Sequence, residues 1–462
     1  MNTQPWAGKP RTLVLQDLIN ERRLSRFQVV TFLLCFAILV LDGYDTVVVG
    51  YIAPALKAHF GAAPAQLAPM FAAGLFGLTL GSFIFGPVAD RFGRKPTLIA
   101  SIAVFALFSL LSAGADSIGM LIALRFLTGL GLGGAMPNAY TLAAEYCPDR
   151  LRSTLVAPIG CGIAAGGALG GLFASRMIGA FGWGSMLVLG GVLPLLLIVV
   201  LARWLPESVR YLVARGGKQA QARAILQRIA PDADLENVTI TLEERRVQGL
   251  PIRHLLGPGI GGGTLLLWTT AFMALLVIYF LGNWLPILIQ QSGVSFHNAS
   301  LMTALYLTGN SLGAILLGVL MDRMNPQYVL CGAFVCASIS LASFGHLSGM
   351  PGLALLALFV TGVGTGGTMT GTNILSAGYY ATASRATGVA WTLGMGRVGS
   401  IVGSMIGGAM LAAHWEAKMI FGAVAVPVLI AAFSVYALAI YRSRHPAAAA
   451  DAARAQIGSA AH

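Results

Sequence analysis

Apolar runs of about 20 residues, the length that an α-helix needs to cross the hydrocarbon core of a bilayer, recur along nearly the whole chain. Only 10% of the 462 residues are charged, whereas a soluble protein carries about a quarter. The sequence therefore predicts an all-α membrane protein with no soluble domain of useful size. We expect twelve spans, at residues 27–53, 67–90, 96–114, 118–146, 153–180, 184–204, 263–291, 297–322, 327–347, 351–380, 385–413 and 417–441.

The net charge is +12, and the positions of the basic residues orient the chain. Among the 29 Lys and Arg, only Lys57, Arg176 and Lys418 fall on the side opposite the termini, while Arg125 and Arg397 fall within spans. This asymmetry follows the positive-inside rule and predicts that both termini are cytoplasmic. The basic surplus thus orients the protein in a lipid bilayer and does not indicate a nucleic-acid partner.

The sequence offers no pattern typical of a metal centre or an enzyme. The seven histidines have no metal-ligand spacing, and the five cysteines lie in spans or at their ends, as buried thiols do. No Ser/His/Asp or phosphate-loop pattern is present, and the glycine runs lie within spans rather than after strands. We expect no metal, no cofactor and no enzymatic activity.

The chain divides into two halves that repeat each other. We expect a six-helix bundle at residues 1–204, a cytoplasmic linker with amphipathic helices at 205–262, and a second bundle at 263–462. TGLGLGGAM, which begins at Thr128, recurs as TGVGTGGTM 233 residues later, and GPVADR at Gly86 recurs as GVLMDR 232 residues later. Such a duplication is typical of secondary transporters, whose substrate path lies between the halves.

The repeat also separates packing from chemistry. Both halves carry a glycine ladder, at Gly129/Gly131/Gly133 and at Gly362/Gly364/Gly366, which lets helices approach closely. The charged residues inside spans are not shared in this way. Arg125 corresponds to Leu358 and Arg397 to Ala164, so these arginines are better candidates for function than for packing.

Two carboxylates, Asp42 and Asp45, lie inside the first span, where each costs about 3 kcal/mol on insertion scales. Their i, i+3 spacing places them on one face of a helix. Asp45 and Arg125 both lie eight residues from the outer ends of their spans, about 12 Å deep, so the charges can meet if spans 1 and 4 adjoin. Because two acids face one base, one of them can take up a proton, which predicts a proton-coupling site. A purely structural ion pair is the alternative.

Arg397 has no acid at similar depth in the second half of the chain. A guanidinium near the middle of a membrane favours an anion, and a carboxylate supplies one with bidentate geometry. The alternative is an arginine that reaches carbonyl groups or an unpaired aspartate of the first half. Arg125 is a second candidate for the substrate anion. We expect the wall of the binding site among Trp391, Tyr306, Asn310, Trp284 and Tyr279, although single aromatic residues more often serve packing.

GPVADRFGRK, from Gly86 to Lys95, lies on the cytoplasmic side between spans 2 and 3. We expect Gly86 to allow close helix contact and Asp90 to cap a helix across the two halves. Positive charges of this loop can pair with acids and close an inner gate. Simple topological anchoring by these charges is the alternative. The predicted gate residues are Gly86, Asp90, Arg91, Arg94 and Glu145, with Asp322, Arg323 and Arg385 as second-half residues of the same gate.

GPVADRFGRK and RFLTG, which begins at Arg125, resemble the loop and fourth-helix motifs of the major facilitator superfamily. LDGYDT from Leu41 to Thr46 and ATGVAWTLGMGR from Ala386 to Arg397 look like the aromatic acid:proton symporter family. The resemblance implies the major facilitator fold in a bacterial inner membrane, uptake of benzoate-type acids such as 4-hydroxybenzoate or protocatechuate, and a role in transport for the acidic pair of span 1, Arg125 and Arg397. Gly167 stands where drug/proton antiporters carry a proline, which weighs against export.

We therefore expect a monomeric symporter that carries an aromatic carboxylate with protons by alternating access. Uptake of another organic anion, such as an aliphatic carboxylate, is one alternative, since it would use the same charges. A membrane sensor with a transporter-like body is another, although the short tails at 1–26 and 442–462 offer no signalling appendage.

Overall fold

The structure is a computed structural model that describes residues 11–20, 22–215, 218–231, 238–241, 255–257, 259–347 and 349–444. Within these residues twelve spans are long and apolar enough to cross a membrane, as predicted. The span helices are α2 (Arg26–Phe60), α3 (Pro64–Phe92), α4 (Arg94–Ser112), α5 (Ile118–Glu145), α6 (Arg152–Phe181), α7 (Gly184–Trp204), α10 (Gly261–Gln291), α11 (Phe296–Arg323), α12 (Pro326–Phe344), α13 (Pro351–Gly366) with α14 (Thr368–Tyr379) as one span, α15 (Thr382–Ala412) and α16 (Ala417–Arg444).

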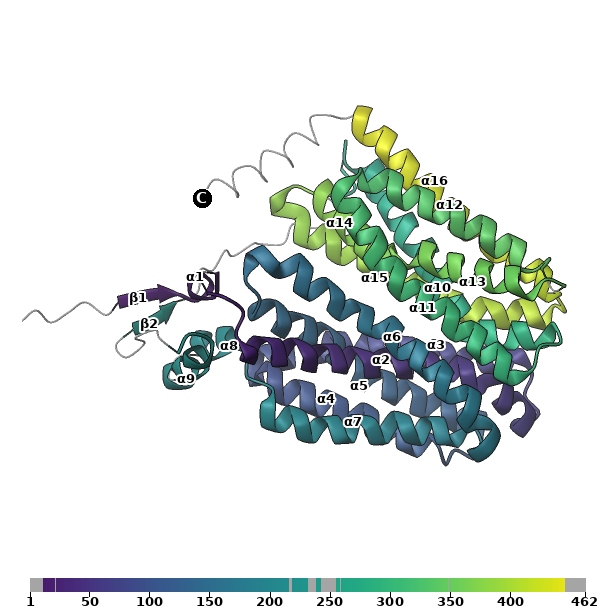
Figure 1. Ribbon diagram of the computed structural model, residues 1–462, viewed down its shortest axis with the longest axis horizontal. Helices are drawn as coiled ribbons and strands as arrows, with labels where there is room; N and C mark the ends of the chain where they lie inside the picture. Colours follow the sequence, from purple (N-terminus) through teal and green to yellow (C-terminus); the bar gives the residue numbers. More distant parts are fainter. Residues whose placement is uncertain are drawn as a thin grey trace, which may run out of the picture.

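The span helices form two bundles, one from α2 to α7 and the other from α10 to α16 (Figure 1). We call them the first and the second bundle. They meet along a seam in which α6 packs against α11, α3 against α15 and α2 against α10. This is the predicted arrangement of two six-helix bundles, and it places the first-span carboxylates on a helix of the seam.

Glycines hold neighbouring helices together within each bundle. A Cβ atom at Gly129 of α5 would overlap the carbonyl oxygen of Gly74 on α3. At the repeated position of the second bundle, a Cβ atom at Gly362 of α13 would overlap the carbonyl oxygen of Tyr306 on α11. The predicted packing role of the glycine ladders is confirmed, because the backbones touch where only hydrogen fits.

The short elements gather at one end of the molecule, which we call the linker end (Figure 1). They are β1 (Arg11–Val14), α1 (Leu15–Asn20), the 3₁₀ turn η1 (Asp149–Leu151), α8 (Val209–Ala214), α9 (Gln219–Ile229) and β2 (Val238–Thr241). The helices α8 and α9 agree with the helices expected in the linker. The parallel pairing of β1 with β2, in which Arg11 faces Val238, was not expected, because four-residue strands leave little pattern in a sequence. Apolar side chains of these elements share one core with the first bundle.

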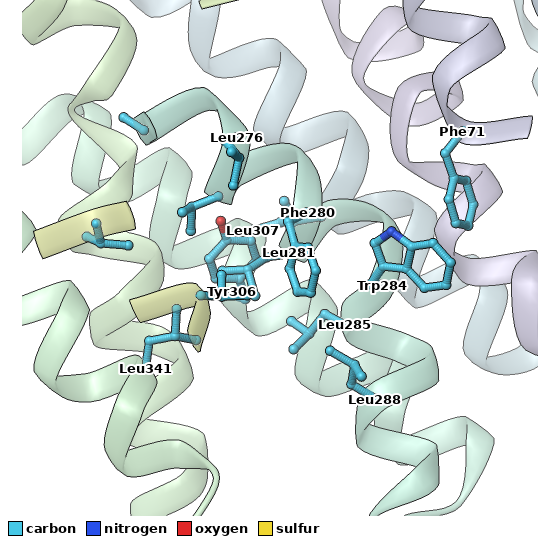
Figure 2. Close-up of a cluster of buried hydrophobic side chains, with 14 of the residues drawn as sticks. Phe71, Leu276, Phe280, Leu281, Trp284, Leu285, Leu288, Tyr306, Leu307 and Leu341 are labelled. Carbon is cyan, nitrogen blue, oxygen red and sulfur yellow. The ribbon is translucent and has the colours of Figure 1, made fainter. Parts of the chain in front are cut away.

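Direct packing closes the seam toward the opposite end, which we call the far end. The rings of Phe71 on α3 and Trp284 on α10 meet edge to face with centroids 4.9 Å apart (Figure 2). His297 Nδ1 lies 2.9 Å from the carbonyl oxygen of Ser175, which joins α11 to α6. A Cβ atom at Gly50 of α2 would overlap the carbonyl oxygen of Gly282 on α10. No wide passage fits between backbones that approach so closely.

Candidate functional site

Asp45 on α2 and Arg125 on α5 form an ion pair inside the first bundle. Arg125 Nη1 lies 3.1 Å from Asp45 Oδ1. Both residues are buried, since Arg125 is only 2% exposed and Asp45 only 4%. The equal depths of the two residues predicted this contact, which the structure confirms. The two charges therefore offset each other's cost of burial, although a pair of this kind is not by itself a source of stability.

Hydroxyl groups complete the surroundings of the pair. Ser109 Oγ lies 3.4 Å from Asp45 Oδ1, and Arg125 Nη2 donates to Ser112 Oγ and Thr128 Oγ1 at 3.3 and 3.2 Å. Arg125 is thus bonded within its own bundle. Its role as a second residue for the substrate anion stays a prediction.

Asp42 lies one helical turn from Asp45, toward the linker end of α2, in a different environment. It is 2% exposed, and its Oδ1 has no hydrogen-bond partner among the described residues. The positive charge that acts on it is that of Arg397, while Asp45 contributes a like charge. A buried carboxylate in this situation is an unusual and costly feature, which marks it as a candidate for function.

Arg397 lies half-buried near the middle of α15 and points toward the first bundle. Its Nη2 lies 3.8 Å from Met136 Sδ of α5. Among the described residues, no carboxylate lies within ion-pair distance of its guanidinium. The sequence left open whether Arg397 reaches a substrate anion, carbonyl groups or an unpaired aspartate of the first half. In this conformation that aspartate is Asp42, whose charge interacts with Arg397 from beyond ion-pair distance.

Two tyrosines share this region. Tyr279 of α10 lies within electrostatic range of Arg397 and Asp42. Tyr140 of α5, whose hydroxyl lies against Gly160 of α6, is within range of Asp42. We call Asp42, Tyr140, Tyr279 and Arg397 the central site. It combines a cation, an acid and two phenols from both bundles, which suits a ligand with a carboxylate and an aromatic ring. Tyr279 was predicted as a wall residue; Tyr140 was missed, although it follows the glycine ladder in a span.

The other predicted wall residues lie elsewhere. Trp284 is fully buried and donates from Nε1 to the carbonyl oxygen of Ser404, and Tyr306 is fully buried too (Figure 2). Neither has a face for a ligand in this conformation, because neighbouring side chains cover both rings. Asn310 donates to Thr365 Oγ1 at 3.2 Å. Trp391 is 42% exposed and stacks on Trp268, with ring centroids 5.9 Å apart, so it keeps a free surface.

The predicted inner gate holds one of its expected ion pairs. Arg94 lies at the start of α4, where its Nε is 3.8 Å from Glu145 Oε1 and its Nη2 is 3.1 Å from Asp90 Oδ1. Its Nη1 donates to Asn138 Oδ1 at 2.9 Å. All four residues belong to the first bundle, so the expected cap by Asp90 across the two halves is wrong for this conformation: Asp90 binds Arg94 instead.

Other expectations for the gate are also corrected. A Cβ atom at Gly86 would meet nothing within 4 Å, so no close helix contact occurs there. The Arg91 guanidinium lies over the ring of Phe92, 5.5 Å from its centroid, rather than beside an acid. Asp322 and Arg323 are exposed at the end of α11, and Arg385 is half-buried in the first turn of α15.

Glu207, just before α8, contacts the predicted gate loop and was not predicted from the sequence. Its Oε1 accepts from the backbone N–H groups of Arg94 and Lys95 at 2.8 and 3.1 Å, so it caps the N-terminus of α4. Ser208 donates to Glu145. The signal available in the sequence was an acid that directly follows Pro206 at the end of a span.

Comparisons with known proteins agree with this geometry. Residues 30–251 match the family described as Sugar (and other) transporter, and residues 267–461 match the Major Facilitator Superfamily. The chain is 40% identical to the 4-hydroxybenzoate transporter PcaK of Acinetobacter baylyi, over 94% of this chain and 96% of that protein. The chain belongs to the major facilitator superfamily. Within this superfamily it is a member of the family that contains PcaK.

Two further relatives support the assignment of this superfamily member. It is 42% identical to PcaK of Pseudomonas putida over 92% of this chain and 95% of that protein, and 39% identical to the gallate transporter of the same species, over 92% and 94%. The inward-open xylose transporter XylE of E. coli has the same fold, with a TM-score of 0.72 and 20% identity over 88% of this chain and 96% of that chain.

Among the described residues, no group of three or more His, Cys, Asp or Glu could hold a metal ion.

Proposed function

We propose that this transporter takes up an aromatic carboxylate, such as 4-hydroxybenzoate or protocatechuate, together with protons by alternating access. The observation that carries the proposal is the half-buried Arg397, which faces the seam in mid-membrane without a carboxylate at ion-pair distance. A substrate carboxylate fits this guanidinium, and Tyr140 and Tyr279 offer ring surface nearby. The names of the relatives at about 40% identity point to the same class of substrate.

The orientation follows from charge. We propose that the linker end faces the cytoplasm of a bacterium, because it carries most of the basic residues. Both termini then lie inside, and the protein acts as a monomer in the inner membrane. Packing of Phe71 against Trp284 closes the far end in the conformation described here. Outward opening requires these contacts to separate.

Arg397 and Asp42 together explain how a proton and an anion can be carried together. Burial disfavours the charged form of Asp42, and without substrate the positive charge of Arg397 opposes this effect of burial. A bound substrate carboxylate neutralises Arg397, so that Asp42 then lies buried without a compensating cation and takes up a proton. Each ligand therefore favours the binding of the other, which is the thermodynamic requirement for symport. Asp45 is held by Arg125 and is the less available of the two acids.

The number of protons sets the driving force. One proton with one monovalent anion moves no net charge, so the pH gradient alone contributes about 1.4 kcal/mol per unit. A second proton would add the membrane potential, about 2.3 kcal/mol per 100 mV. The two carboxylates of α2 allow either case.

Uptake into proteoliposomes tests the proposal. An inside-alkaline pH gradient should drive accumulation of labelled 4-hydroxybenzoate, and a proton ionophore should abolish it. Protocatechuate and other hydroxybenzoates should compete, whereas aliphatic carboxylates of similar charge should compete poorly, because they lack a ring for Tyr140 and Tyr279. Equal competition by both classes would favour a general organic-anion transporter. Binding without any transport would favour a sensor.

A further inference from the structure

A small closed cavity lies between the bundles, beside the contact of Phe71 with Trp284 and apart from the central site. It measures about 30 Å³ and is lined from α2, α3, α5 and α10. The half-buried Thr46 of α2 lines it, and so do three deeply buried polar side chains: Asp45 and Arg125 from the first bundle and Asn283 from the second. Nearly all its other lining residues are apolar.

Each of these polar groups is deeply buried and has capacity left for a hydrogen bond. Arg125 Nε has no partner among the described residues, and the residue is 2% exposed. Asn283 is buried as deeply and donates from Nδ2 to Ser404 Oγ at 2.9 Å. Its carboxamide oxygen accepts no hydrogen bond within the described part of the chain. Unused polar groups that converge on one closed space call for a small polar ligand.

We propose that this cavity is a binding site for one water molecule, which joins the Asp45–Arg125 pair of the first bundle to Asn283 of the second. The volume suits a single water, since a site needs about 10–15 Å³ of this kind of space and two to four polar partners. The water donates to the Asp45 carboxylate and to the Asn283 carboxamide oxygen, and it accepts from Arg125. Every hydrogen of the water then has an acceptor.

Hydrogen bonds connect Asn283 of this site to α15, the helix that carries Arg397. Asn283 donates to Ser404 Oγ, which donates to the carbonyl oxygen of Ser400 at 2.9 Å. Ser400 Oγ in turn donates to the carbonyl oxygen of Arg397 at 2.7 Å. The water thus links the buried ion pair to the segment of α15 that carries Arg397, across the seam between bundles.

The consequence for transport depends on the proposed function. When the far end opens, α2 and α10 part at this level, and the cavity joins the outer water, so that protons enter beside Asp45 and pass on to Asp42, one helical turn further toward the linker end. The titratable groups around Asp45 are Arg125 on α5 and, on its own helix, Asp42 and Tyr44. The cavity residues from α3 and α10 carry no charge. The water site is therefore the closed inner end of an entry path for protons.

Two measurements test the water site. An experimental map that resolves ordered waters should show density within hydrogen-bond distance of Asp45, Arg125 and Asn283 in the far-closed state. Asn283→Leu removes one partner and should lower accumulation driven by a pH gradient by about tenfold, the effect of leaving a buried polar group unsatisfied. Substrate counterflow at equal pH, which needs no net proton movement, should stay within about twofold of the parent, a change of less than 0.5 kcal/mol.

Matched variants separate this effect from general damage. Asn283→Ser replaces the carboxamide by a hydroxyl, which still donates and accepts hydrogen bonds, and makes room for a second water, so it should retain most of the accumulation. Ser338→Ala removes a buried hydroxyl of the second bundle that bonds to Ala425, far from the cavity, and should leave both assays unchanged. A cavity without water density, or an Asn283→Leu variant that accumulates substrate as the parent does, would overturn the water site. If the parent itself shows no pH-driven accumulation, the proposed function fails, and the map alone then decides the water site.

Discussion

Arg125 holds Asp45 in a buried ion pair at 3.1 Å, while Asp42, one turn away on the same helix, keeps an oxygen without a partner. Two carboxylates of one helix face therefore have different environments. Such differences assign different tasks to chemically identical groups. We infer that Asp45 serves the structure of the first bundle and that Asp42 exchanges the proton.

The ion pair should show the stability pattern of a buried pair. Removing one partner by Asp45→Asn or Arg125→Leu leaves the other charge or its hydrogen bonds unmatched, at a cost of about 3–5 kcal/mol for a fully buried pair. The double variant D45L/R125L should recover most of that loss, since no charge remains in the apolar interior. Thermal unfolding in detergent measures both effects. If the single variants unfold at the same temperature as the parent, the ion pair does not stabilise the first bundle.

Asp42→Asn should uncouple transport from protons. The amide resembles a protonated carboxyl group in shape and carries no charge, so the variant should exchange substrate across the membrane but lose accumulation in a pH gradient. Its exchange rate should also vary less with pH than that of the parent. Counterflow and gradient-driven uptake in the same proteoliposomes measure the two activities. Full accumulation by this variant would assign the proton to another residue.

The ion pair was predictable, whereas the layout of the central site was only partly so. Equal depth in two spans placed Asp45 beside Arg125, because helix rise converts residue count into depth. The depth of a residue in the membrane does not show which way its side chain points around the helix axis, however. That direction places Trp284 inside the seam and Tyr140 at the central site. Span number and bundle division were predictable, since bilayer thickness limits helix length.

Arg397 should determine affinity for the carboxylate. Arg397→Ala removes charge-assisted hydrogen bonds of about 1.5–3 kcal/mol, which corresponds to a roughly 10- to 150-fold rise in KM. Arg397→Lys keeps the charge without the fork geometry and should give an intermediate KM. Competition by the methyl ester of 4-hydroxybenzoate, which lacks the anion, should be weak in the parent and no weaker in Arg397→Ala. An unchanged KM in Arg397→Ala would exclude this residue from the anion site.

Gly50 should control closure of the far end. In Gly50→Ala, the new Cβ atom overlaps the Gly282 carbonyl oxygen, so the bundles can no longer approach fully. Spin labels at Phe181, the last residue of α6, and at Ser292, the residue after α10, should report a longer distance in this variant. Gly422→Ala is the matched control, because a Cβ atom there meets nothing within 4 Å. Equal distances in Gly50→Ala and the parent would contradict closure through this contact.

Glu207 should fasten the linker to the first bundle. Glu207→Gln keeps the shape but loses the charge that faces the α4 N-terminus, a loss of about 0.3–1 kcal/mol, and Glu207→Ala should cost more because the hydrogen bonds to Arg94 and Lys95 go as well. Apparent Tm measures this ranking. Glu416→Gln is the control, since its ion pair with Lys418 is exposed and contributes little. A Tm order in which Glu416→Gln is the least stable would refute the capping role.

The gate residues illustrate a second limit of sequence reasoning. Arg94 pairs with Glu145 as expected, but Gly86 and Asp90 make no contact across the seam in this conformation. A motif whose contacts form in only one state of the transport cycle is the same sequence in every state. The sequence therefore does not show in which state the contacts form. Contacts between the bundles can therefore be assigned only to the conformation in which they are seen, whereas the glycine ladders lie within each bundle.

Proton uptake on substrate binding tests the central claim most directly. When 4-hydroxybenzoate is added to the purified protein in weakly buffered solution, a pH indicator should report about one proton taken up per bound anion, since Asp42 loses its compensating charge as the anion binds Arg397. Asp42→Asn should bind the anion without this proton uptake. Binding by the parent without proton uptake, or equal proton uptake by parent and Asp42→Asn, would contradict the account.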